Sequence, residues 1–406
     1  MNRTSGHQLI DRLYEAVRDE DPCVVTGALL ALDALLVSEG GVVVRRQMKS
    51  HLVSRLDSFP PLQLASVLQV LSKYKPRDDD ELFRQLSSLD VYLEHSSGPV
   101  VVACAQLYVT LLSDSYPHLE GDLIRRTVPA LKRFISSGGP VARHVVSFLL
   151  EQKKEWLEAF SKSSEDIALF HLKNGDQPDL VLDKLMTLPF VCHHLEEVSL
   201  VLVAIESWWV NSGNEKTEFL KEAVASCVHK LAKKVPNASG HCLNSLLRLL
   251  DFETDNHMAK GSSSTQITWK GILKAILRIG LSGFGQEVAT SAMSKILEGV
   301  DFTDKNLPEV IPALMAECGY MMEEGPYILE AMINNFSNYN DGTQHLLLSA
   351  SMAMFFHRPA SCQHALGRLL EKCLNTSPSS NGTSMELAVR AQQYFTLLRE
   401  DTALAE

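Results

Sequence analysis

The sequence predicts an all-α fold in which antiparallel helix pairs stack side by side. The main observation is a proline at the head of successive apolar segments, at Pro22, Pro61, Pro99 and Pro140, with spacings of 39, 38 and 41 residues. Proline is favoured in the first helical turn because its φ is fixed and no N–H donor is needed there. A period of about 40 residues without strand patterning is typical of HEAT or armadillo repeats. Such an α-solenoid, a superhelix of helix pairs, presents an elongated surface and favours a scaffold for other proteins.

Each repeat is expected to contribute a second helix between the proline-headed ones. Three intervening segments are amphipathic at the helical period: Val42–Leu56, Asp79–Leu93 and Asp122–Ile135. In the segment that begins at Pro22, one apolar stripe should face the neighbouring repeat. That stripe consists of Val25, Ala28, Leu29, Leu32, Leu35 and Leu36.

Glycine-containing turns separate these helices. They occur at Glu39–Gly41, Ser96–Gly98 and Ser137–Gly139. Glycine is common just after a helix because it adopts the left-handed conformation that ends many helices. We therefore expect all three turns to close a helix in this way.

The later part of the chain is also helical in pattern. Helical segments are expected at 179–187, 195–210, 216–235, 239–250, 269–281, 288–300, 307–322, 327–336, 345–356, 362–374 and 384–398. A polar tract at 251–268 interrupts the pattern and predicts a mobile surface loop, with a second short loop at 375–382. The predicted organisation is therefore helical repeats over 1–250, the loop, and late repeats over 269–406. Neither end of the chain has the polar pattern of a capping helix, so we expect a segment of a longer protein or ends covered by partners.

Composition narrows the class of protein. The chain has 406 residues, 45% hydrophobic and 21% charged, which is enough to bury a continuous core. A formal net charge of -11 argues against nucleic acid as a partner but does not exclude a local basic patch. The sequence has no apolar run long enough to cross a bilayer and no signal peptide, so the expected compartment is the cytosol. The eight cysteines are scattered and are interpreted as buried, reduced thiols.

The sequence gives little support for catalysis, a cofactor or a metal site. His193, His194, Glu196 and Glu197 contain metal-binding side chains, but adjacent positions on a helix do not converge and the HExxH spacing is absent. The acidic run Asp78–Glu81 is interpreted as a cap at a helix start. Three glycines, Gly280, Gly283 and Gly285, lack the dinucleotide-binding pattern and indicate a helix break. The chain is therefore predicted not to be an enzyme.

Several segments resemble the trunk of the beta adaptins of heterotetrameric adaptor complexes. These segments are Asp19–Val44, with its DPxVV helix, Leu64–Leu82, with its Y-x-P-basic-acidic-acidic turn, His95–Leu112, Tyr320–Phe336, His345–Cys373 and Leu387–Leu398. Glu39–Val43, Arg358–Ala360 and Leu366–Leu370 look most like the beta adaptin of adaptor-protein complex 4. The resemblance covers residues 8–135 and 318–398 and is thin between them.

The resemblance implies a coat scaffold in vesicle transport. Its partners would be the medium, small and second large adaptin subunits, with an Arf-type small GTPase as a further candidate. The implied location is peripheral on trans-Golgi network or endosomal membranes, where the complex sorts cargo. Relative to the family, the first trunk repeats, the hinge and the appendage are expected to be absent. The alternative is another helical-repeat scaffold, such as an importin-like transport receptor or a phosphatase scaffold.

Two further groups of residues are candidates for protein contacts. In Trp208-Trp209, one ring is expected to enter the core, and the second, if exposed, would be an interface anchor. Leu249, Leu250 and Phe252 fit the short apolar and acidic pattern by which adaptor hinges hold clathrin. Because the two leucines also continue an apolar helical stripe, we interpret them as core residues, which burial would hide from a partner.

Overall fold

The computed structural model describes residues 3–112, 116–160, 163–212, 218–260, 270–298, 300–305, 307–375 and 382–400. Over these ranges the chain is helical and contains no strand, which confirms the predicted all-α repeat fold. The helices gather into two compact units, Met1–Cys192 and His193–Glu406. Across the ranges given above, no helix combines the length and the apolar character needed to cross a membrane.

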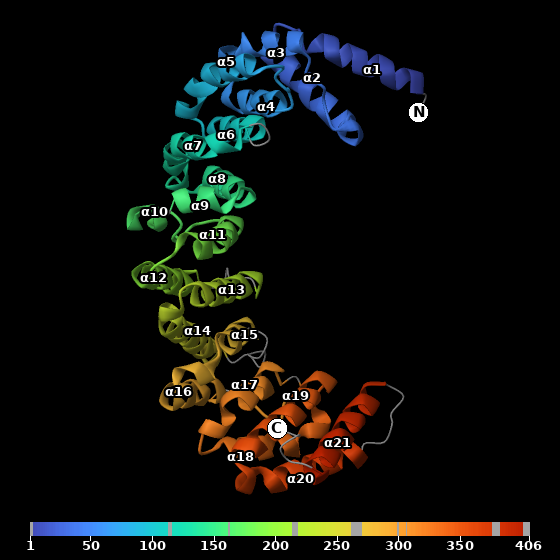
Figure 1. The fold of residues 1–406 in the computed structure, drawn as a ribbon, viewed down its shortest axis with the longest axis vertical. Coiled ribbons are helices and arrows are strands. Elements are labelled where there is room, and N and C mark those ends of the chain that lie inside the picture. The colour runs from blue at the N-terminus through green and yellow to red at the C-terminus, as the bar shows by residue number, and fades with distance from the viewer. Residues whose placement is uncertain are drawn as a thin grey trace. The chain divides into compact units, whose positions relative to one another are not determined.

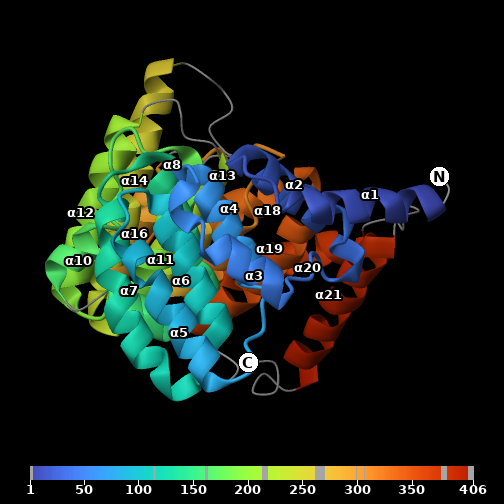
Figure 2. The ribbon, with the colours of Figure 1, turned by 90° about the horizontal axis from the view of Figure 1, so that it is seen from above.

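The first unit is a stack of short helices. Its α-helices are α1 (Arg3–Ala16), α2 (Pro22–Leu35), α3 (Arg46–Val53), α4 (Pro61–Leu71), α5 (Asp79–Leu89), α6 (Gly98–Leu112), α7 (Glu120–Ile135), α8 (Gly139–Glu151), α9 (Lys154–Ala159), α10 (Ser164–Ala168) and α11 (Pro178–Val191). One layer runs α2, α4, α6, α8 and α11, each packed on the next, and α4 and α6 lie side by side in Figures 1 and 2. The helices between them, such as α7, pack against this layer.

The recurring prolines begin the layer's helices as predicted. Pro22 and Pro61 are the first residues of α2 and α4, and Pro99 and Pro140 are the second residues of α6 and α8. Pro178 begins α11 in the same way, although the sequence pattern is weaker there. Each proline sits where a helix has no hydrogen-bond acceptor for the missing N–H.

Two of the three predicted glycine turns have left-handed backbone. Gly41 has a φ of 88°, and Gly138 and Gly139 each have a φ of 69°. The prediction for Gly98 is wrong, because this residue is the buried first residue of α6 and has no positive φ. Its glycine serves close packing instead: a Cβ here would overlap Val141 and would lie 3.1 Å from the Phe134 ring.

The predicted stripe of α2 forms part of the core, with one exception. Val25, Leu29 and Leu32 are at most 1% exposed, and Ala28 and Leu36 are also buried. Leu35, however, is 51% exposed. It is the last residue of α2 and lies at the margin of the stripe, where the chain passes into the 3₁₀ turn Val37–Glu39.

The second unit repeats the two-layer arrangement. Its α-helices are α12 (Leu195–Asn211), α13 (Glu218–Lys234), α14 (Ser239–Lys260), α15 (Lys270–Ile279), α16 (Gln286–Leu297), α17 (Val310–Cys318), α18 (Gly325–Asn334), α19 (Asp341–His357), α20 (Pro359–Asn375) and α21 (Gly382–Glu400). One layer runs α13, α15, α17, α19 and α21, while α12 packs on α14 and α18 packs on α20. Figures 1 and 2 show α20 and α21 side by side.

The prediction of a loop at 251–268 is wrong for residues 251–260, which are helical. The helix α14 continues to Lys260, and residues 261–269 lie outside the described part of the chain. The extension begins with two acidic residues that have cationic partners. Asp251 pairs with Lys295 of α16 at 2.9 Å, and Glu253 pairs with Lys221 of α13 at 2.9 Å. These contacts make a helical conformation favourable for a stretch that its polarity alone suggested was a loop.

Polar contacts between helices recur at about one repeat of sequence separation. In both units they join a cation to an acceptor roughly 40 residues away, which is about one repeat. Examples are Lys73 with Asp33 (40 residues apart), Arg126 with Asp90 (36) and Arg368 with Glu330 (38). Backbone carbonyls are used similarly, since Arg358 donates to the Met322 oxygen over 36 residues. Equivalent positions of successive repeats are therefore joined by side chains as well as by the apolar core.

Candidate protein interface

The residue groups that could suggest enzymatic chemistry serve structural purposes. The backbone N–H groups of His193 and His194 donate to Glu197 Oε2 at 2.6 and 3.0 Å, so this carboxylate caps α12. Gly280 and Gly285 have φ values of 84° and 86° on either side of a 3₁₀ turn, which is the predicted helix break. Within the described ranges, no group of three or more His, Cys, Asp or Glu side chains is arranged to hold a metal ion.

The thiols are buried, apart from one near a helix start. Cys104, Cys192, Cys227, Cys242, Cys318, Cys362 and Cys373 are buried and reduced, whereas Cys23 in the first turn of α2 is exposed. Burial raises the pKa of Cys242 and of Cys318 to about 12 and the pKa of Cys373 to about 11. Such thiols remain protonated at neutral pH and are poor nucleophiles.

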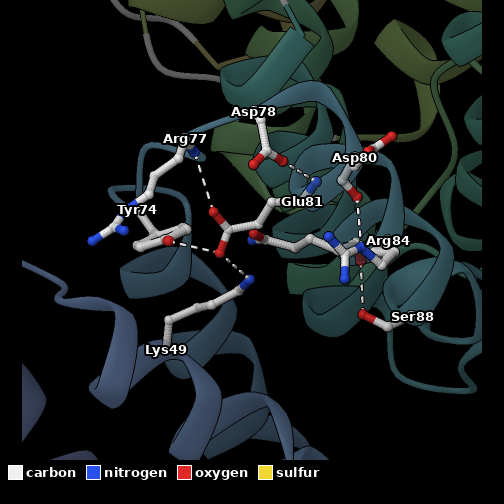
Figure 3. Close-up of polar contacts among 9 residues, drawn as sticks. Lys49, Tyr74, Arg77, Asp78, Asp80, Glu81, Arg84 and Ser88 are labelled. Atoms are coloured by element: carbon white, nitrogen blue, oxygen red, sulfur yellow. Dashed lines mark hydrogen bonds and ion pairs between the residues drawn. The ribbon is translucent and has the colours of Figure 1, made fainter.

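Glu81, in the first turn of α5, is the centre of a polar cluster that joins α5 to α3 and to the segment between α4 and α5 (Figure 3). Its Oε1 accepts hydrogen bonds from the Tyr74 hydroxyl at 2.8 Å and from Lys49 Nζ at 3.1 Å, and its Oε2 accepts from the Arg77 N–H at 3.2 Å. The Asp78 carboxylate accepts from the Glu81 N–H at 2.7 Å and caps α5, as predicted for this acidic run. Lys49 comes from α3, while Tyr74 and Arg77 come from the segment between α4 and α5. The Y-x-P-basic-acidic-acidic turn therefore links neighbouring helices.

Because of Glu81, the free energy of unfolding of the first unit is expected to depend on pH in the acidic range. The Tyr74 hydroxyl, followed by the Arg77 N–H, lowers the pKa of Glu81 from an ordinary 4.5 to about 2. A carboxylate with a lowered folded-state pKa stabilises the fold above the ordinary pKa and loses that contribution as pH falls toward the lowered value. Glu81→Gln should therefore destabilise the protein by about 1–3 kcal/mol at neutral pH. The difference from wild type should shrink between pH 4.5 and 2 in thermal unfolding.

Asp80→Asn is the matched control, because Asp80 is an exposed residue of the same helix turn. It removes the same charge without removing an acceptor of the cluster. An equal loss of stability in both variants would show that helix charge, and not the cluster, is responsible.

Both adjacent tryptophans are buried, so the condition for a surface anchor, an exposed second ring, is not met. Trp208 is 6% exposed and Trp209 is 0% exposed, and both lie near the end of α12. Neighbouring positions on a helix differ by about 100°, but the buried side of α12 is wide enough to include both. It also contains Val201 and Ile205. Neither ring is available as a surface anchor.

Leu249 and Leu250 are in the core, as the apolar stripe predicted. They are 2% and 1% exposed within α14, which continues through this sequence. Phe252 is half-buried in the same helix. A short linear motif must be extended and accessible to be bound by a groove on another protein. In this conformation the residues contribute to packing.

Sequence reasoning missed two buried ion pairs. Lys184 Nζ lies 2.7 Å from Asp176, with side chains only 1% and 5% exposed, and Lys221 Nζ lies 2.9 Å from Glu253. Lys184 also donates to the His171 carbonyl at 3.1 Å. A signal was present, because Lys184 occupies an apolar-face position of α11. Its neighbours on that face are Leu180, Val181, Leu185 and Leu188.

The accessible features of the molecule are helix faces and shallow grooves. On α12, Leu200, Val203 and Val210 are more than half exposed and lie on the side opposite the core. In the first unit, a groove of about 600 Å³ and a smaller cavity of about 190 Å³ share Asp90 and Arg126, an ion pair between repeats. Apolar surface of this kind is typical of contacts with other proteins. The arrangement suits binding along helix faces.

The stacked helix pairs of both units define a helical-repeat protein. Residues 3–402 match the model of the adaptin N-terminal region, so the chain belongs to this family. The AP-4 complex subunit beta-1 of mouse is 25% identical over 376 residues, which are 90% of this chain and 47% of the relative. The resemblance to beta adaptins is thereby confirmed, and the chain spans about half the length of this relative.

Structures of other proteins share the fold at low sequence identity. A homology model of the full-length AP-3 complex in an intermediate open conformation matches with a TM-score of 0.51 and 12% identity, over 95% of this chain and 69% of that one. The crystal structure of Kap121p bound to RanGTP matches with a TM-score of 0.53 and 13% identity, over 97% of this chain and 45% of that one. At these identities the likeness establishes the α-solenoid alone.

Proposed function

We propose that this chain is the beta-type trunk of a heterotetrameric adaptor coat complex. The observation that carries the proposal is the family match over residues 3–402, together with the beta adaptin relative. The chain would hold the medium, small and second large subunits along its helix faces without catalysing a reaction. An importin-like receptor shares the solenoid but is not favoured by the family match.

The proposal extends to where the complex acts. By analogy with the AP-4 relative, the complex would be peripheral on trans-Golgi network or endosomal membranes and would sort cargo into vesicles. An Arf-type GTPase bound to GTP would recruit it. Attachment through the assembled complex is consistent with the absence, among the described helices, of one that could span a bilayer.

Co-isolation from cells tests the proposal directly. The tagged full chain, expressed at low level, is expected to recover medium, small and second large adaptin subunits, identified by mass spectrometry. A variant with a disrupted core, Leu29→Asp, is the control for specific folding-dependent recovery. Recovery of Ran or of a phosphatase catalytic subunit in place of the adaptins would overturn the proposal.

A further inference from the structure

Helices α13 and α15 carry a group of basic side chains that we call the basic patch. The two helices lie against each other in one layer of the second unit. Lys230 and Lys233 are three residues apart on α13, and Lys274 and Arg278 are four residues apart on α15, so each pair lies on one helix face. Lys230, Lys233 and Arg278 are exposed and Lys274 is half-buried. The patch contrasts with the formal net charge of -11 for the whole chain.

Three cations of the patch, Arg278 of α15 and Lys230 and Lys233 of α13, act electrostatically on His229 of α13. Burial, and then the charges of Arg278, Lys233 and Lys230, lower the pKa of this imidazole. Cations from both α13 and α15 are therefore close enough to His229 to influence its charge. His229 Nδ1 is buried and has no hydrogen-bond partner among the described residues.

The basic patch lacks counter-ions of its own. Within the described ranges, Lys230, Lys233, Lys274 and Arg278 form no ion pair. Some other cations of this unit are paired, as in Arg248 with Glu206 at 3.2 Å, Lys295 with Asp251 at 2.9 Å and Arg368 with Glu330 at 2.8 Å. Gathered like charges repel one another, and binding of an anionic group removes that repulsion.

Glutamate residues lie near both ends of α15. A Cβ at Gly271, near the start of α15, would lie 3.3 Å from the Glu222 Cα, and a Cβ at Gly280, after its end, would lie 3.4 Å from Glu317 Oε1. These two glycines are nine positions apart, which corresponds to about 14 Å of helix axis. A nucleic acid or an anionic membrane would extend past the cations onto Glu222 and Glu317. A few acidic residues fit between them.

We propose that the basic patch binds a short acidic segment of a partner polypeptide. This rests on the proposed scaffold function, because it assigns one contact surface of that scaffold and the chemistry of what is held there. Aspartate or glutamate side chains would supply the charges that α13 and α15 lack. Charge complementarity of this kind contributes to partner selection and to association rate.

Direct binding of an acidic peptide tests the inference. The probe is a fluorescein-labelled peptide with four consecutive glutamates, which span about 14 Å when extended, titrated with the full chain by anisotropy at low ionic strength. Lys230→Ala/Arg278→Ala should weaken binding about tenfold, because two of the attracting charges are lost. Arg248→Ala/Lys295→Ala removes the same net charge from the same unit but leaves the patch intact, and should bind like wild type. Lys230→Arg/Arg278→Lys should also bind like wild type.

Three results would overturn the inference. These are equal binding by the patch variant and its charge-matched control, binding of vesicles rich in phosphatidylserine more tightly than of the peptide, or a preference for a DNA oligonucleotide of equal charge. The outcome is separable from the test of the proposed function. If wild type recovers no adaptin subunits but the patch-dependent peptide binding holds, the proposed complex is wrong and the patch stands. If the subunits are recovered but the peptide binding is independent of the patch, the proposed complex stands and the inference about the patch is wrong.

Discussion

Replacing Leu29 by Asp is expected to destabilise the first unit by about 4 kcal/mol or more. Leu29 is 1% exposed on the side of α2 that packs within the helix stack. Loss of a buried leucine side chain costs about 2–5 kcal/mol. A carboxylate at the same place is also removed from water without a partner, which adds a desolvation penalty. Thermal unfolding followed by circular dichroism should show a large fall in the transition temperature of this unit.

Leu30→Asp is the matched control for this change. Leu30 is the next residue of the same helix and is 50% exposed, so its carboxylate can remain in water. The control should alter the transition only slightly, since surface substitutions are usually worth less than about 0.5 kcal/mol. Similar effects of the two variants would contradict the helical phase assigned to α2.

Removing Asp176 is expected to have a comparable effect, chiefly because a buried charge is left unpaired; its Oδ2 also accepts a hydrogen bond from the Lys173 backbone N–H at 3.0 Å. Its carboxylate is the partner of the buried Lys184 ammonium at 2.7 Å, and without it the partner of Lys184 among the described residues is the His171 carbonyl. Breaking one side of a buried ion pair costs about 3–5 kcal/mol, because the other charge remains unpaired. Asp176→Ala should therefore unfold at a much lower denaturant concentration than wild type.

A double variant separates the ion pair from other effects of the substitution. Asp176→Ala/Lys184→Met removes both charges and keeps the apolar stem, and such replacements are often neutral or stabilising. It should recover most of the stability that Asp176→Ala loses. If the double variant is no more stable than Asp176→Ala, the loss does not come from an unpaired lysine.

The pH dependence of Asp176→Ala provides a second measurement. Burial already lowers the pKa of Lys184 from its ordinary value of 10.5 in the intact pair. A lysine with a lowered folded-state pKa binds fewer protons when folded than when unfolded, so stability rises with pH up to the ordinary value. Loss of the Asp176 charge should strengthen this rise in the variant. Wild type should show a shallower slope over the same alkaline range.

Much of the fold could be predicted from local features of the sequence. The prolines at 22, 61, 99 and 140 mark real helix starts because their effect depends only on backbone geometry at that position. The apolar stripe of α2 was correct except at Leu35, where the helix ends. Gly98 shows the limit of such reasoning. Its glycine is needed for close approach to Val141 and Phe134, and sequence alone does not show that contact.

The surface was harder to predict because it depends on which repeats meet. The polar stretch after Leu250 has the composition of a loop, but it is helical and its first acidic residues pair with Lys221 and Lys295 of other helices. Whether the second ring of Trp208-Trp209 is exposed could not be decided from the sequence, and both rings are buried within the unit. The basic patch joins residues about 45 positions apart, so it becomes visible only when α13 and α15 are placed together.

The side-chain contacts that span one repeat have a mechanical consequence. Because Lys73, Arg126 and Arg368 each reach only the preceding repeat, no polar link among them holds distant parts of a unit together. Two neighbouring repeats can therefore separate partially under strain while the contacts between the other repeats of the unit remain intact. In amide hydrogen exchange, the helices at each contact between repeats should then show their own degree of protection, and the unit should not open in one cooperative step.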